Sequence, residues 1–231
     1  MRKIFLTLIA VVGLCAVACS SNSKSASSEM KQKSDSTRTA VVYFSATGTT
    51  RAAAEEVARA AGARLFEIQP TEAYTDADLD WHDKLSRSSV EMRDSSARPA
   101  IKPIDFNPAD YDLVFVGYPI WWYVAPRIIE TFLDTYDLSG KRVATFATSG
   151  GSPIEPCDTA LAKEYPAVKF IGGRLLNGTS PDSIAAWVDS LEKYNRLFLR
   201  HGSLGHRDRT RRAFGKHSVV DDSHSRLKAV A

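Results

Sequence analysis

The chain has 231 residues, 44% of them hydrophobic, which is enough for one sizeable core but leaves little room for a second domain. The formal net charge is +3, yet residues 38–200 carry 18 Lys and Arg against 22 Asp and Glu, whereas residues 201–231 carry 7 against 3. Because the basic excess lies in the tail, the mildly acidic central part gives no support to nucleic-acid binding.

The N-terminus has the features of an export signal. Arg2 and Lys3 precede an apolar stretch, residues 4–18, which is too short to span a bilayer. Small residues then lead to Cys19, which resembles the lipobox of bacterial lipoproteins, so we expect a signal peptide over 1–18 and a lipid on Cys19. The alternative is an ordinary signal peptide cleaved near the same place, with Cys19 incidental.

The segment 19–37 is serine-rich and predicts a flexible tether of roughly 20 to 25 Å root-mean-square span. A lipid on Cys19 would hold the mature protein to a membrane without a transmembrane helix. We therefore expect a location in the bacterial cell envelope, on the periplasmic side or at the outer membrane.

Residues 38–200 alternate between two patterns. Short apolar runs rich in β-branched residues predict strands at 39–44, 64–68, 113–118, 143–148 and 168–171. Helical patterns occupy 51–61, 125–136, 157–165 and 182–199, and Gly62 ends the first. This alternation predicts one α/β domain with a parallel sheet and helices on both faces. The stretch 70–108 is expected to be a long excursion, partly helical around 78–92.

The loop after the first strand is rich in hydroxyl groups. Residues 45–50 read Ser-Ala-Thr-Gly-Thr-Thr and lead into the first helix, where backbone N–H groups and the helix dipole favour a phosphate. The loop contains no lysine and no GxGxxG, so it is neither a Walker loop nor a dinucleotide fingerprint. It is typical of a site for one phosphate monoester, although a ligand-free helix cap explains it equally well on its own.

The loops after the third and fourth strands add an aromatic cluster and further donors. Residues 118–123 read Tyr-Pro-Ile-Trp-Trp-Tyr, and exposed aromatic groups at a strand end favour stacking against a flat ring. Residues 148–152 read Thr-Ser-Gly-Gly-Ser and offer backbone donors to the edge of such a ring. Alternatively, one or both tryptophans belong to the core beneath the 70–108 excursion.

The order and spacing of these loops resemble the flavodoxin-like FMN-binding proteins, in particular the bacterial branch with a Tyr-Pro-Ile-Trp-Trp segment. The resemblance covers about residues 39–200 and implies a three-layer, doubly wound sheet of five parallel strands in the order 2-1-3-4-5. It implies FMN as cofactor and electron transfer through the flavin, as a carrier or a quinone-type reductase. The implied contacts with FMN are Ser45, Thr47, Gly48, Thr49, Thr50, Pro119, Ile120, Trp121, Trp122, Thr148, Ser149, Gly150, Gly151 and Ser152.

The remaining features point to no second active site. No acid/base pair or nucleophile is visible, so any chemistry is expected from the flavin itself, with a protein, a quinone or a pyridine nucleotide as redox partner. The alternative is a non-catalytic module that binds flavin or protein. Asp76, Asp78 and Asp80 lack the glycine and glutamate of a calcium loop, and Cys157 is expected to pack at a helix start. The basic tail 201–231 is expected to be disordered.

Overall fold

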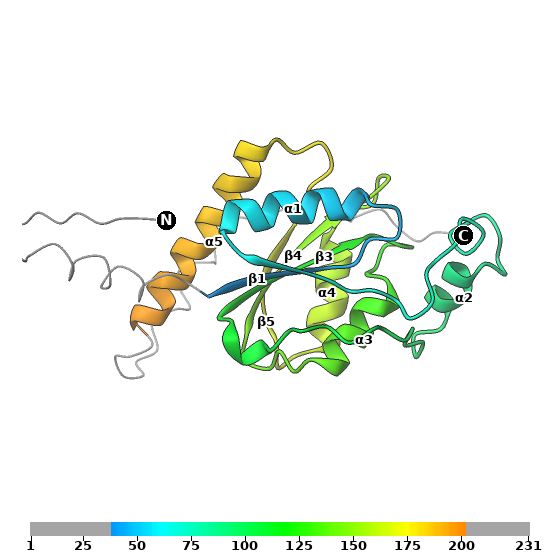
Figure 1. The fold of residues 1–231 in the computed structure, drawn as a ribbon, viewed down its shortest axis with the longest axis horizontal. Helices are drawn as coiled ribbons and strands as arrows, with labels where there is room; N and C mark the ends of the chain where they lie inside the picture. Colours follow the sequence, from blue (N-terminus) through cyan, green and yellow to red (C-terminus); the bar gives the residue numbers. More distant parts are fainter. Residues whose placement is uncertain (1–37, 202–231) are drawn as a thin grey trace, which may run out of the picture. The chain divides into compact units, whose positions relative to one another are not determined.

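The computed structural model describes residues 38–201, which form one parallel sheet flanked by helices (Figure 1). The strands are β1 (Thr39–Tyr43), β2 (Arg64–Glu67), β3 (Leu113–Pro119), β4 (Arg142–Thr148) and β5 (Lys169–Leu175). Their order in the sheet is β2-β1-β3-β4-β5, and all neighbouring pairs are parallel. This confirms the predicted fold class and strand order.

The helices form the two outer layers. They are α1 (Thr49–Ala61), α2 (Arg87–Arg93), α3 (Arg127–Thr135), α4 (Glu155–Glu164) and α5 (Pro181–His201), with a short 3-10 helix, η1, at Pro108–Asp110. Figure 1 shows α1 and α5 on one face of the sheet and α3 and α4 on the other. The two faces have separate apolar clusters, one with Val57 and Val188 and the other with Phe132 and Leu161. The central strands are continuous apolar runs because both of their faces are covered.

Two glycines with left-handed backbone conformations flank α1. Gly48, with φ +90°, precedes α1, and Gly62, with φ +56°, follows it. The Gly62 N–H donates to the carbonyl oxygens of Ala58 and Arg59, as expected of a helix-ending glycine. The predicted end of this helix at Gly62 is therefore confirmed.

The excursion between β2 and β3 differs in detail from the prediction. Its helix, α2, begins only at Arg87, whereas residues 78–86 form successive turns. Local side-chain bonds explain this difference, because Asp78 accepts from the Thr75 N–H and Asp80 accepts from the His82 N–H. Such bonds compete with the helical ladder. Ser86 then caps α2 by accepting from the Ser89 N–H.

The predicted signal peptide over 1–18, Cys19, the predicted tether 19–37 and the tail beyond residue 201 lie outside the described residues. Between residues 38 and 201, no helix has both the length and the apolar character that a membrane crossing requires. The last helix continues to His201, one residue beyond the predicted domain end.

Candidate functional site

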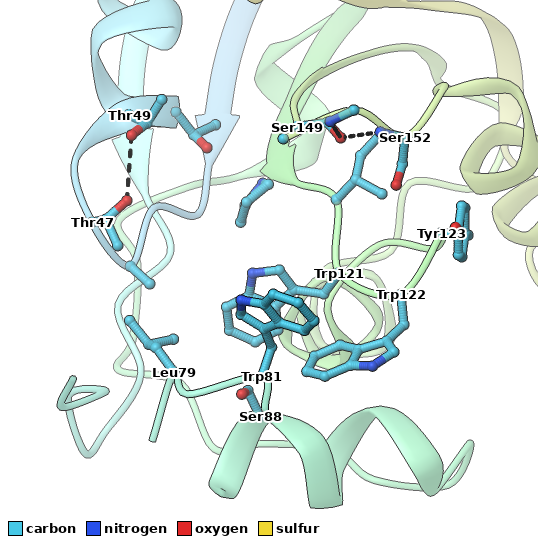
Figure 2. Close-up of a pocket in the computed structure, with 16 residues that line it drawn as sticks. Thr47, Thr49, Leu79, Trp81, Ser88, Trp121, Trp122, Tyr123, Ser149 and Ser152 are labelled. Atoms are coloured by element: carbon cyan, nitrogen blue, oxygen red, sulfur yellow. Dashed lines mark hydrogen bonds between the residues drawn. The ribbon is translucent and has the colours of Figure 1, made fainter. Parts of the chain in front are cut away.

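A cavity of about 670 Å³ opens at the carboxyl ends of β1, β3 and β4. Ligands of doubly wound sheets bind at this edge, where neighbouring strands lead to helices on opposite faces. Figure 2 shows Thr47 and Thr49 at one side of the cavity, Ser149 and Ser152 at another, and three indoles along a third. Its lining consists of Ala46, Thr47, Thr49, Thr50, Leu79, Trp81, Ser88, Pro119, Ile120, Trp121, Trp122, Tyr123, Ser149, Gly150, Gly151 and Ser152.

The N-terminus of α1 is open to an anion. No side chain caps the helix after Gly48, and its first turn holds no acidic residue. The first N–H groups of a helix have no partner within it, so they can donate to a phosphate. The exposed hydroxyl groups of Thr47 and Thr49 lie beside them, with their Oγ1 atoms 3.4 Å apart. These donors are neutral and suit one phosphate group.

Two of the predicted hydroxyl groups in this region stabilise the loop instead of lining the cavity. Ser45 Oγ accepts from the Gly48 N–H at 3.0 Å. The Thr148 hydroxyl lies 2.8 Å from that of Thr50, and both side chains are buried. This pair connects the end of β4 to the first turn of α1, so it fixes the distance between the first and third loops.

The loop at the end of β3, residues 118–123, which we call the aromatic loop, forms a two-residue turn. Trp121 and Val124 exchange both N–H···O=C bonds at 3.1 Å. The central residues, Trp122 and Tyr123, have φ of +46° and +68°, the left-handed conformation that a type I′ turn requires. Glycine or asparagine usually occupies such positions, since each left-handed L-residue costs roughly 1 to 2 kcal/mol. The Cys157 thiol donates to the Tyr123 carbonyl oxygen at 3.5 Å.

The turn separates the two tryptophans. Trp121 is half-buried and meets the rings of Phe44 and Tyr74 edge-on, at 5.7 and 5.4 Å between centroids. Trp122 is 43% exposed. The alternative that both tryptophans are core residues is therefore wrong, because only Trp121 packs against the core, and it also borders the cavity.

The third loop, residues 148–152, is held by the side chains of Ser149 and Asn177. Ser149 Oγ accepts from the N–H groups of Gly151 and Ser152, and Asn177 accepts from the Ser149 N–H while donating to its carbonyl oxygen. Most of the backbone donors expected for a ligand are thus used within the protein. Gly150 is the residue of this loop whose N–H these bonds leave for a ligand.

Most of the residues predicted from the sequence come together in this one cavity. Ser45, Gly48 and Thr148 do not line it, whereas all the other predicted residues do. The sequence interpretation missed three residues of the excursion, namely Leu79, Trp81 and Ser88. It also missed Asn177, which follows β5 at the same edge of the sheet and had no motif to mark it.

The electrostatics of the site offer no protein acid or base. None of the lining residues, all in the described part of the chain, carries a charge. Burial raises the pKa of the nearby Cys157 thiol to about 12, so this thiol is protonated at neutral pH and packs as a small apolar group. Between residues 38 and 201, no cluster of His, Cys, Asp and Glu side chains is suited to hold a metal ion. The arrangement can hold a phosphate and a flat ring.

Comparisons with known proteins show the family to which the chain belongs. The model of the family described as flavodoxin matches residues 38–191. A crystallised protein of Bacteroides eggerthii, provisionally named a flavoprotein, is 54% identical over 67% of this chain and 97% of its own, with a TM-score of 0.65. The corresponding protein of Bacteroides uniformis is 51% identical over 66% of this chain and 98% of its own, with a TM-score of 0.64.

A more distant structure is the Lactobacillus acidophilus flavoprotein, solved in complex with FMN. It is 24% identical over 62% of this chain and 95% of its own, with a TM-score of 0.53, and therefore shows likeness of fold alone. No curated protein matches the chain.

Proposed function

The chain belongs to the flavodoxin family, and from this premise we propose that it binds FMN and transfers electrons through the flavin, as a carrier or as a quinone-type reductase. The observation that carries the proposal is the meeting, in one cavity, of an uncapped helix N-terminus and an aromatic wall. FMN has the matching parts, a terminal phosphate and a planar ring. The FMN complex of the Lactobacillus acidophilus protein supports this choice of ligand.

The described residues divide the work of binding between the two ends of the ligand. The hydroxyl groups of Thr47 and Thr49, with the first N–H groups of α1, would hold the phosphate. Trp121, fixed by its contacts with Phe44 and Tyr74, would lie against the ring. The single set of phosphate donors favours FMN over FAD, which needs a cradle for a pyrophosphate.

The bound flavin would supply the redox chemistry, because it can accept electrons from one partner and pass them to another. The protein would position the ring and exclude water from its buried face. The alternative function is a module that holds FMN, or another protein, without turnover. Steady-state assays with NADH, NADPH and quinones identify a reductase, because it turns over pyridine nucleotides directly whereas a carrier or a storage module does not.

FMN binding is tested by titration of the purified full-length protein with FMN and with riboflavin, which lacks the phosphate. We expect quenched flavin fluorescence and much tighter binding of FMN than of riboflavin. Thr49→Val should weaken FMN binding roughly ten- to hundredfold by removing a hydrogen bond to a charged group, with little effect on riboflavin. Thr135→Val, at the exposed end of α3, is the matched control. Unchanged flavin fluorescence with the wild-type protein would contradict the proposal.

We also propose that the protein acts in the bacterial cell envelope, tethered by a lipid on Cys19. This proposal rests on the sequence pattern of the N-terminus alone.

A further inference from the structure

Two exposed indoles border the mouth of the cavity. Trp81, from the excursion, is 67% exposed, and Trp122, from the aromatic loop, is 43% exposed. Large apolar side chains that gather at the opening of a cavity are typical of a binding surface. In Figure 2 the indoles of Trp81 and Trp122 lie on the same side of the cavity as that of Trp121.

The position of Trp81 is defined by local contacts. Its ring lies against that of His82, with 3.6 Å between the centroids and the planes tilted by 34°, and the His82 N–H donates to Asp80. Trp121, by contrast, is held by Phe44 and Tyr74. Trp81 and Trp121 therefore belong to different aromatic clusters, and neither needs the other for its position.

A buried hydroxyl group without a partner lies in the same part of the cavity. Ser88 is only 2% exposed, and its Oγ has no hydrogen-bond partner within the described chain. Figure 2 shows Ser88 near Trp81, on the first turn of α2, and its side chain lines the cavity. A buried hydroxyl group without a hydrogen-bond partner is unfavourable. Its position at a cavity wall points to a ligand atom that accepts a hydrogen bond from it.

The lining also limits the charge of that ligand. Every described residue that borders the cavity is neutral, so no cation is present to pair with a second phosphate or a carboxylate. A pyridine nucleotide would bring a pyrophosphate to this opening without a partner for it. A planar, uncharged molecule with a carbonyl oxygen fits the two indoles and the Ser88 hydroxyl.

We propose that Trp81, Trp122 and Ser88 form a second binding subsite, beside the FMN site, for a planar uncharged aromatic carbonyl compound of the quinone class. The indoles stack on the ring, and the Ser88 hydroxyl donates a hydrogen bond to the carbonyl oxygen. This inference rests on the proposed FMN binding, and it names the ligand class and the residues that select it.

The test is calorimetric titration of the oxidised, FMN-loaded protein with 1,4-naphthoquinone, with naphthalene and with NADH. Trp81→Ala should weaken naphthoquinone binding about three- to tenfold through lost stacking, and Trp81→Phe should retain most of it. Ser88→Ala should weaken naphthoquinone binding by a similar factor and leave naphthalene binding unchanged, because naphthalene has no carbonyl oxygen. The thermal unfolding temperature of Ser88→Ala should not fall, since the lost hydroxyl has no partner. Leu85→Ala, an 83% exposed site on the same excursion outside the cavity, is the matched control.

Several results would overturn the subsite. Wild-type affinity for naphthoquinone in both Trp81→Ala and Ser88→Ala would do so, as would tighter binding of NADH than of naphthoquinone. An equal loss of FMN affinity in these variants would assign Trp81 and Ser88 to the FMN site instead. Failure of the wild-type protein to bind FMN at all would remove the proposed function together with the subsite, and the FMN titration distinguishes this case from the others.

Discussion

Asp158 shows how a single residue near the site is held in the interior. It lies on α4 and accepts a hydrogen bond from the Thr145 hydroxyl of β4. Gly173 of β5 makes room for it, because a methyl group at that position would overlap the carboxylate and the hydroxyl. Burial raises the pKa of the Asp158 carboxyl group, and the Thr145 bond opposes this rise only in part. Folding therefore makes the Asp158 carboxyl group harder to ionise than it is in the unfolded chain.

This preference predicts a pH dependence of stability. A carboxyl group with a raised pKa in the folded state contributes its stability below the unfolded pKa of about 3.9, and this stability is lost as the pH rises through the folded pKa. Asp158→Asn should therefore raise the thermal unfolding temperature at pH 7 and leave it nearly unchanged at pH 3.

The matched control for Asp158→Asn is Asp137→Asn. The Ser139 hydroxyl and N–H lower the pKa of Asp137, so this substitution should lower the unfolding temperature at pH 7. A fall in the unfolding temperature of Asp158→Asn at pH 7 would show that the Asp158 carboxylate stabilises the fold in its charged form.

One arginine of the excursion, Arg98, forms ion pairs with both α3 and α4. Arg98 donates to Glu130 and Asp134 of α3 at 2.8 and 2.6 Å, and to Glu164 of α4 at 2.8 Å. Glu130 is buried, and burial raises its pKa even though Arg127 and Arg98 both oppose the rise. Arg98 and Arg127 both pair with Glu130, so the network attaches the excursion, which also carries Trp81, to α3.

Removal of this arginine should be costly. Arg98→Ala leaves three carboxylates near one another, one of them buried, and should lower the free energy of unfolding by about 3 kcal/mol. Arg38→Ala, which breaks an exposed pair with Asp112, should lower it by less than about 1 kcal/mol. Urea unfolding of the two variants measures the difference, and similar losses in both would contradict a special role for the Arg98 network.

At the same scale, the sequence predicted some elements better than others. The strands β1, β3 and β4 were predicted to within one residue, because buried strands are uninterrupted apolar runs. The fifth strand is longer than predicted, since Gly172 and Gly173 interrupt its apolar pattern and conceal its continuation to Leu175. The start of the helix in the excursion was predicted about nine residues too early, at 78 instead of Arg87. The hydrogen bonds of Asp78 and Asp80 stabilise turns where propensity allows a helix.

The limits of prediction for the site arise at the scale of the whole molecule. The loops after β1, β3 and β4 could be placed together from the sequence, because parallel strands end at one edge of the sheet. Trp81 and Ser88 could not be placed there, because no periodic pattern states where a long excursion folds back. Local contacts orient the Trp81 ring, but the place of the excursion as a whole depends on contacts between residues far apart in the sequence, such as the Arg87 guanidinium over the Tyr74 ring and the bonds of Arg98.

The proposed attachment of the molecule to a membrane is tested by two cysteine variants of the N-terminus. Cys19→Ala removes the thiol to which the lipid would be joined, so the variant should move from the membrane fraction to a soluble fraction of the envelope, with an unchanged flavin spectrum. Cys15→Ala, four positions earlier in the predicted signal peptide, should remain with the membranes and should still incorporate labelled palmitate. If Cys19→Ala also sediments with membranes, or if both variants are released, lipid attachment at Cys19 is wrong. If the wild type is released together with both variants, an ordinary cleaved signal peptide is the better interpretation, and the domain would reach its redox partner by diffusion.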